Sequence, residues 1–396
     1  MERKRIAVIG GGPAGLMAAD VLVPFHDVDL YEQGKTVGRK FLVAGQGGFN
    51  LTNSAEGTAL LGQYAPSGFL DDALAAFGPT ELRAWLHEIF IDTFVGTSGR
   101  VFPIKGIKPI EVLQTIRDRL IERGVRFHME HTFAGFDEQG RPIMEHGKDR
   151  TALDADFVLF ALGGASWPVT GSTGKWPALF APLGIHAARF QPSNCGITIN
   201  WPEHFIAAHA GKPLKNVRVT TGDRSVLGEA TITQYGLEGN AIYPIVPALR
   251  DALGNAPTAF VHLDMKPNNT EAQLIQKLNG RPSKEFAEAL NLDRAGTALL
   301  KACTTKEQFL SPTDLVHHVK HLRLEVTALR PIEEAISTVG GIRTEALTSS
   351  FAFKRFPHLF AIGEMVDWDA PTGGFLLQGC FAMGHHAARS ILGTAP

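Results

Sequence analysis

Cysteine is scarce in this sequence, and the shortage excludes two kinds of protein. Among 396 residues only Cys195, Cys303 and Cys380 occur, and no two of them form a C-x-x-C pair. Three widely separated cysteines build neither a disulfide framework nor a dithiol redox centre, and they favour a reducing compartment. We therefore expect a cytoplasmic protein.

Long apolar runs and a charge excess of one sign are also missing. No run reaches the ~18 residues of a membrane span. The apolar stretch behind the first basic residues, 6–9, is too short for a signal peptide. The formal net charge is −2, and residues 191–330 carry 15 basic and 13 acidic side chains. We therefore expect a small-molecule partner, with neither nucleic acid nor membrane; composition does not indicate an oligomeric state.

The first 33 residues carry a dinucleotide-binding pattern. A short apolar run leads into GGGPAG (10–15), then a helical pattern, then a second strand that ends in an acid. In such a motif the first glycine permits a tight turn, the second admits the pyrophosphate and the third lets helix and strand pack. The helix N-terminus binds phosphate, and the acid binds a ribose. This pattern alone does not separate FAD from NAD. It predicts contacts at Gly10, Gly12, Pro13, Ala14, Gly15, Glu32 and Gln33.

Two later strands favour FAD. Residues 157–164 form an apolar run that ends in Gly163 and Gly164, and residues 359–364 form another that ends in Gly363 and Glu364. In two-dinucleotide flavoproteins an acid after a late strand binds the ribityl chain, which NAD lacks. Glu364 can do this with one extra methylene; the alternative is a helix N-cap or an exposed acid.

A glycine-rich stretch, 370–378, precedes a final helical pattern that reaches about residue 391. We expect this helix to begin near Thr372 or Gly373 and to direct its N–H groups at the pyrimidine edge of a flavin. The alternative is a helix that only packs on the first helix, and both can hold. The predicted contacts are Thr372, Gly373, Gly374, Phe375 and Leu376.

The segment 38–53 combines four glycines, two cations and three amide side chains. A loop of this kind can lie against a planar ring and a pyrophosphate, although it can also be an irregular surface loop. Lys40 and Asn50 are catalytic candidates, together with Arg100, which either binds an anionic substrate group or forms a structural ion pair. The predicted cofactor contacts here are Arg39, Lys40, Gly45, Gly47 and Asn50.

The middle of the chain differs from both flanks. Residues 191–330 begin with short β-branched runs and continue with helical patterns. We expect residues 1–190 and 331–396 to form one discontinuous domain, and 191–330 to form an inserted domain that covers the substrate. His317 and His321 are four residues apart, but no acidic partner completes a metal motif, so no metal site is predicted.

These motifs together resemble the BaiN-like NAD(P)/FAD-dependent oxidoreductases, a flavoprotein family that also includes aminoacetone oxidase. The resemblance implies an α/β, Rossmann-type two-dinucleotide FAD-binding fold built from both chain ends, with an inserted β-barrel-like plus helical domain and non-covalent FAD. Many members read G-R-C-N where this chain has Gly48-Phe49-Asn50, so a cysteine proton donor is impossible there. The matching segments, in order along the chain, are 10–15, 38–53, 99–103, 161–166, 171–174, 337–342 and 361–378.

Two reaction directions follow from an FAD-dependent oxidoreductase of this kind. A reductase would take a hydride from NADH or NADPH, as a transient donor, and pass it to a conjugated C=C bond; the family includes enzymes acting on a steroid-type ring and on a uracil in ribosomal RNA. An oxidase would take a hydride from an amine such as an aminoketone and pass electrons to O₂. A third possibility is a non-catalytic protein that binds flavin and acts as a binding or sensor protein.

Overall fold

The computed structural model describes residues 2–43 and 49–393, which divide into two compact units. Unit 1 comprises Met1–Gln191 and Ile336–Pro396, and unit 2 comprises Pro192–Ala335. The sequence-based boundaries, 190/191 and 330/331, lie close to these divisions. Unit 1 therefore draws on both ends of the chain.

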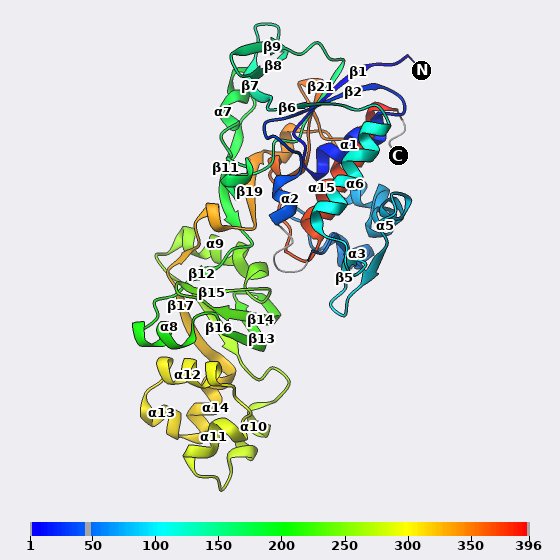
Figure 1. The fold of residues 1–396 in the computed structure, drawn as a ribbon. Helices are drawn as coiled ribbons and strands as arrows, with labels where there is room; N and C mark the ends of the chain where they lie inside the picture. The colour runs from blue at the N-terminus through cyan, green and yellow to red at the C-terminus, as the bar shows by residue number, and fades with distance from the viewer. Residues whose placement is uncertain (1, 44–48, 394–396) are drawn as a thin grey trace. The chain divides into compact units, whose positions relative to one another are not determined.

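Unit 1 is organised around a six-stranded sheet with the order β20-β21-β10-β1-β2-β6 (Figure 1). All neighbouring strands run parallel except β20 and β21. Residues Ile6–Ile9 of the inner strand β1 are buried, as expected for a strand covered on both faces. The strands are β1 (Arg5–Ile9), β2 (Asp27–Glu32), β6 (Arg126–Met129), β10 (Phe157–Phe160), β20 (Ala352–Phe353) and β21 (Phe356–Ala361).

Two helices from opposite ends of the chain, α1 (Pro13–Leu22) and α15 (Phe375–Ile391), pack against each other in unit 1 (Figure 1). Their contact is close because Gly384 has no side chain: a Cβ there would lie 2.2 Å from the carbonyl oxygen of Ala14. A third helix, α6 (Pro109–Glu122), also contacts α1 and buries one apolar face. The first turn of α1 is thereby held firmly against the sheet.

Three small sheets complete unit 1. Their strand orders are β3-β5-β4, β7-β8-β9 and β11-β19. The remaining elements are α2 (Arg39–Val43), β3 (Thr52–Asn53), α3 (Gly57–Leu61), α4 (Asp71–Ala76), α5 (Pro79–Glu88), β4 (Thr93–Val95), β5 (Arg100–Pro103), β7 (Thr132–Phe136), β8 (Pro142–His146), β9 (Asp149–Ala152), η2 (Pro168–Thr170), α7 (Pro177–Phe180), η3 (Ala181–Leu183), β11 (Ala187–Ser193), β19 (Ser337–Ile342), η7 (Thr344–Ala346) and η8 (Gly363–Met365).

Unit 2 contains a seven-stranded antiparallel sheet with the order β17-β16-β13-β14-β15-β12-β18. The two outermost strands, β17 (Leu322–Val326) and β18 (Ala328–Leu329), are separated by Thr327 alone. One continuous stretch therefore pairs at both ends of the order, which closes the sheet and confirms the β-barrel-like expectation. The other strands are β12 (Ile197–Thr198), β13 (Pro213–Thr221), β14 (Arg224–Ile232), β15 (Gly236–Glu238) and β16 (Ala259–Asp264).

The helices of unit 2 lie mostly after the strands, as the sequence pattern predicts. Helices α12 and α14 contact strands β13 and β16 and bury a shared apolar core (Figure 1). Three α-helices, α8, α9 and α13, were not predicted from the sequence. The helices are α8 (Glu203–His209), η4 (Tyr243–Ile245), α9 (Val246–Asn255), α10 (Glu271–Leu278), η5 (Ser283–Glu285), α11 (Phe286–Ala289), α12 (Arg294–Cys303), α13 (Lys306–Leu310), α14 (Pro312–His321) and η6 (Ile332–Glu334).

The final helix begins later than the sequence predicts. We expected a start near Thr372 or Gly373, but α15 begins at Phe375. Gly373 and Gly374 have φ values of +110° and +102°, and a right-handed helix cannot include such residues. Across residues 2–43 and 49–393, no helix combines the length and the hydropathy that a bilayer crossing requires.

Candidate functional site

A cavity of about 500 Å³ lies in unit 1, where four parallel strands end. Its walls include Ile9–Ala14 after β1, Glu32 and Gln33 at the end of β2, Ala161–Gly163 after β10 and Ile362–Glu364 after β21. The carboxyl ends of parallel strands, on either side of the point where strand order reverses, are where α/β sheets bind ligands. We call this space the strand-end cavity.

The glycine-rich loop has the geometry that the motif requires. Gly10 has a φ of +114°, and a Cβ there would lie 2.2 Å from the carbonyl oxygen of Ala161. A Cβ on Gly15 would lie 2.1 Å from the oxygen of Gly10, whereas a Cβ on Gly12 would meet no atom within 4 Å. The space in front of Gly12 belongs to the cavity, beside the free N–H groups that begin α1. A pyrophosphate fits this space.

Glu32 holds the glycine-rich loop in place. One of its carboxylate oxygens accepts a hydrogen bond from the N–H of Gly11 at 2.9 Å, and the other accepts from the N–H of Gly34 at 2.7 Å. Because each carboxylate oxygen has two lone pairs, Glu32 can still accept hydrogen bonds from the hydroxyls of a ribose. The backbone partners orient the carboxylate before any ligand binds.

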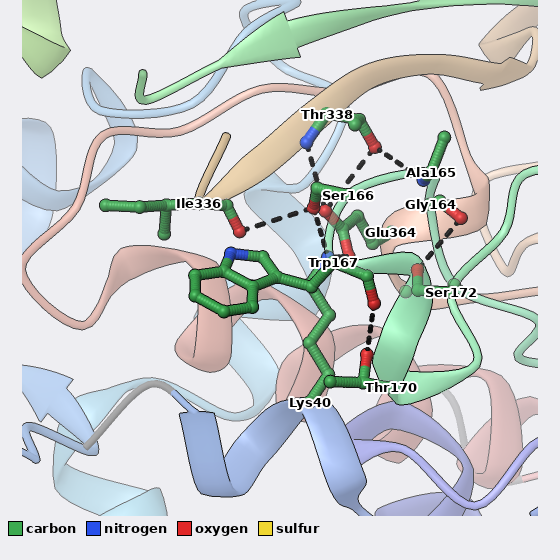
Figure 2. A network of polar contacts seen from close by, with 12 residues as sticks. Lys40, Gly164, Ala165, Ser166, Trp167, Thr170, Ser172, Ile336, Thr338 and Glu364 are labelled. Atoms are coloured by element: carbon green, nitrogen blue, oxygen red, sulfur yellow. Dashed lines mark hydrogen bonds and ion pairs between the residues drawn. The ribbon is translucent and has the colours of Figure 1, made fainter. Parts of the chain in front are cut away.

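A second acid, Glu364, also lines the cavity and is paired with a lysine from a distant segment. Figure 2 shows Lys40 extending from α2 toward Glu364 and Ser166. The Lys40 Nζ lies 2.6 Å from Glu364 Oε2 and donates to Ser166 Oγ at 2.7 Å. Glu364 Oε1 accepts from the backbone N–H of Thr338 at 3.0 Å. Glu364 is therefore a positioned, partly buried carboxylate in a wall of the cavity rather than an exposed acid.

The loop that follows β10 also faces the cavity, and it engages two predicted cofactor residues. Gln33 Nε2 donates to the carbonyl oxygen of Gly171 at 2.8 Å, and an Arg39 guanidinium nitrogen donates to that of Val169 at 2.8 Å. Both side chains line the cavity, yet these donors hold the loop. Within this loop Trp167 has a left-handed backbone, with φ of 56°, which is uncommon for a bulky residue.

The sequence did not reveal one wall of the cavity. Tyr31 of β2 and His131, which directly precedes β7, line it together with Thr132 and Phe133. The Tyr31 ring stacks on His128 with the centroids 4.5 Å apart, and burial raises the pKa of Tyr31 to about 12. These residues meet through sheet pairing of segments about one hundred positions apart, which no local motif records.

Cys380, on α15, also lines the cavity and was not predicted to do so. Burial, and secondarily the charge of Glu364, raises the pKa of its thiol to about 12. The sulfur is therefore a protonated, weakly polar part of the wall at neutral pH and not a thiolate nucleophile.

The other predicted residues gather at a second place, outside the described lining of the cavity. Thr372–Gly374, which we call the glycine turn, lies beside β3 and β5. The Nδ2 of Asn53 donates to the carbonyl oxygen of Gly373 at 3.1 Å, and Arg100 Nε lies 3.6 Å from the position of a Cβ on that glycine. Arg100 belongs to the strand that pairs with Asn53. The structure thus brings Arg100 to the turn before α15.

Of the remaining predicted cofactor residues, some contact other parts of unit 1, and two are outside the residues that the structure describes. Phe375 is buried, and its carbonyl oxygen accepts from the hydroxyl of Tyr64 at 2.9 Å, while Leu376 packs against the core. Asn50 precedes β3 and is partly exposed. Gly45 and Gly47 lie outside the described residues.

The strand-end cavity fits one kind of ligand in particular. Its lining includes an acid suited to a ribose, a glycine cradle suited to a pyrophosphate and a second acid paired with a lysine. FAD presents a ribose, a pyrophosphate and a ribityl chain that such groups can bind, whereas NAD has no ribityl chain. Fold and site together define an FAD-dependent oxidoreductase.

Comparisons with known proteins agree. Residues 4–390 match the model described as "HI0933-like protein Rossmann domain", so the chain belongs to the HI0933-like family. It is 25% identical to a 3-dehydro-bile acid delta(4,6)-reductase from Clostridium scindens, over 98% of each chain. It is 22% identical to a ribosomal RNA dihydrouridine synthase from Haemophilus influenzae, over 97% of each. The resemblance to BaiN-like flavoproteins is confirmed.

A solved structure supports the fold alone. The chain is similar to the 3-ketosteroid delta1-dehydrogenase of Sterolibacterium denitrificans, with a TM-score of 0.53, 12% identity and full coverage of both chains.

Proposed function

We propose that this protein uses NADH or NADPH to reduce a conjugated C=C bond in a small molecule. Bound FAD supplies the hydride chemistry, by accepting a hydride from the nicotinamide and passing one to the substrate. The full-length similarity to a bile-acid reductase supports the direction of the reaction. We also propose that residues 192–335 form the substrate-covering domain.

The charges at the glycine turn carry this proposal. Arg100 places a guanidinium there, partly buried, with no hydrogen-bond or ion-pair partner in the ranges 2–43 and 49–393. The 17-residue helix α15 begins just after the turn and adds the positive end of its dipole. When a hydride adds to the β-carbon of a conjugated enone, negative charge develops on the carbonyl oxygen, and a proton from solvent then adds to the α-carbon to complete the reduction. The guanidinium of Arg100 would stabilise that charge on the substrate, and the N-terminus of α15 would act on the flavin.

The same charges disfavour the amine oxidase alternative. A cationic amine would be repelled by Arg100, and the nearby acids already have partners. Glu364 pairs with Lys40, and Asp367 accepts from the N–H of Gly340 at 2.9 Å.

The residues at the strand-end cavity have assigned roles in this proposal. Glu32 would bind the adenosine ribose, Gly12 and the start of α1 the pyrophosphate, and Glu364 the ribityl chain. Lys40 would position Glu364 and neutralise its charge. The glycine turn and the N–H groups that follow it would face the pyrimidine edge of the flavin.

Anaerobic stopped-flow absorbance near 450 nm tests the proposal. The purified holoprotein is mixed first with NADH or NADPH, and the reduced protein is then mixed with a conjugated enone. We expect a nicotinamide to bleach the flavin and the enone to restore the colour without oxygen. Bleaching by an amine alone, followed by recovery in air with peroxide, would establish the oxidase instead. Recovery only with uridine-containing RNA would assign the substrate to nucleic acid.

A further inference from the structure

We infer that residues 167–171, which we call the flap, close over the strand-end cavity, and that Gln33 and Arg39 are the latch that holds the flap shut. In this assignment the two side chains set how fast FAD enters and leaves, and they do not bind the cofactor themselves. The inference rests on the proposed assignment of the strand-end cavity to FAD, and it adds to that assignment a route of entry and the residues that control it.

The flap is a self-contained turn. Its centre is the short helix η2, Pro168–Thr170, in which the N–H and the hydroxyl of Thr170 both donate to the carbonyl oxygen of Trp167, at 2.9 and 2.7 Å (Figure 2). The N–H of Gly171 donates to the carbonyl oxygen of Pro168 at 3.0 Å. These bonds and the fixed φ of proline keep the turn in one shape, so it can move as one piece.

A left-handed residue lies at each end of this turn. Trp167 has a φ of 56° and Gly171 a φ of 102°. Glycine adopts such a backbone freely, but in a tryptophan it is strained and persists only while surrounding contacts hold it. The backbone can therefore relax at Trp167 once the contacts that hold the flap are released, and the two residues are suited to act as hinges.

The residues on either side of the flap are anchored by buried groups. Ser166 is fully buried, and its hydroxyl accepts from Lys40 at 2.7 Å. Ser172 is also buried, and its hydroxyl donates to the carbonyl oxygen of Gly164 at 2.9 Å (Figure 2). Movement is thereby confined to the five residues between these two serines.

Two exposed hydrogen bonds hold the flap against the segment that follows β2. Gln33 donates to the carbonyl oxygen of Gly171 at 2.8 Å, and Arg39 donates to that of Val169 at 2.8 Å. Of the hydrogen bonds in the described parts of the chain, these two alone join the flap to a segment distant in sequence. Water competes for exposed hydrogen bonds, so the latch can open without disturbing the core.

The latch bridges two walls of the strand-end cavity. Gln33 and Arg39 line it on one side, and Thr170 and Gly171 of the flap line it on the other. The bridging hydrogen bonds are exposed to solvent, whereas Ala14, at the start of α1 in the same cavity, is buried. A dinucleotide bound along the glycine-rich loop would therefore lie behind the bridge, and its exchange would require the flap to open.

The latch should affect rates and not affinity. One such hydrogen bond changes an equilibrium by about 5-fold, so two favour the closed flap by roughly 30-fold. Because the same two bonds form whether or not FAD is present, their loss speeds entry and exit equally. Direct contact with FAD would behave differently, since losing it would speed exit alone and weaken binding.

Stopped-flow flavin fluorescence tests the latch. Apoprotein is mixed with FAD to measure association, and holoprotein is mixed with an excess of a scavenging apoflavoprotein to measure release. The test variant is Gln33→Met with Arg39→Met, which keeps side-chain length and removes both donors. The matched control is Lys35→Met, an exposed lysine of the same segment that lies outside the cavity lining. Amide hydrogen exchange of residues 167–171 in the apoproteins provides a measurement that needs no FAD.

The double variant should take up and release FAD roughly 10- to 30-fold faster, with a Kd within about 3-fold of the parent's, and its flap amides should exchange faster. Each single variant should speed both rates about 5-fold, and Lys35→Met should match the parent. Faster release without faster association, with a raised Kd, would overturn the inference and make Gln33 and Arg39 direct ligands of FAD. Unchanged rates in the double variant would also overturn it.

Failure of the cavity assignment would look different. In that case Gly12→Val, whose side chain enters the cavity, would bind FAD with the parent's Kd. The exchange of the flap amides in the apoproteins would still report whether Gln33 and Arg39 hold the flap.

Discussion

The Lys40–Glu364 pair joins segments 324 positions apart, and its removal should have a measurable cost. In Lys40→Met the partly buried Glu364 loses its cation and keeps only its contacts with Thr338. Losing one partner of a fully buried pair costs about 3–5 kcal/mol, and exposed pairs contribute at most about 1. The Lys40 and Glu364 side chains are 27% and 16% exposed. We therefore expect a loss of about 2 kcal/mol.

Thermal melting of the apoprotein measures this loss. For a unit of this size, 2 kcal/mol corresponds to a fall in Tm of roughly 4–8 °C. The double variant Lys40→Met with Glu364→Gln removes both charges, so it should lose less than the sum of the two single variants, by at least about 1 kcal/mol. Lys35→Met, an exposed lysine nearby, is the matched control and should melt like the parent. Exact additivity of the single losses, or an unchanged Tm in Lys40→Met, would refute the reasoning.

Three further predictions address the cofactor loop, a histidine and a tyrosine. Gly12→Val should fold but bind FAD at least ~100-fold more weakly in equilibrium dialysis, because its side chain enters the space for the phosphates. Gly10→Ala should instead lower the Tm, because its Cβ would collide with the backbone of Ala161. Equal Tm values for the two variants would contradict this prediction. Burial lowers the pKa of His385 from 6.5 to about 4, so the free energy of unfolding should fall by at most roughly 3 kcal/mol as the pH drops through that interval. In His385→Leu this pH dependence of the free energy of unfolding, measured by urea titration at several pH values, should be smaller. Tyr64→Phe should cost about 1 kcal/mol, because a buried hydroxyl loses its bond to Phe375; since burial also raises the pKa of Tyr64, its phenolate absorbance should rise only on unfolding.

Local patterns predicted the parts of the site that lie within one segment. The strand, the glycines and Glu32 come within about thirty positions. Each residue type there is required either by the backbone conformation or by one hydrogen bond to the ligand. The late strand that ends in Gly363-Glu364 was found in the same way. The β-branched runs likewise indicated that the inserted segment begins with strands, whereas its barrel-like form was implied by the family resemblance.

Contacts between distant segments were not predictable in this way. Nothing near Lys40 indicates that it meets Glu364, and nothing near Arg100 indicates that it reaches Gly373. Both contacts depend on how strands and helices from opposite ends of the chain pack. The late start of α15 was missed for a different reason. Glycine adopts positive and negative φ about equally well, so the sequence did not show that Gly373 and Gly374 have positive φ values.

The discontinuity of unit 1 has a consequence for biosynthesis. Strand β21, the neighbour of β10, and helix α15, which covers α1, both follow unit 2 along the chain. During translation, unit 2 can fold as soon as its own residues leave the ribosome, but the first half of unit 1 must wait with an incomplete sheet. Because Glu364 also arrives late, a nascent chain has no complete place for the flavin. The FAD site can therefore be complete only after the segment that contains β21, Glu364 and α15 has been synthesised.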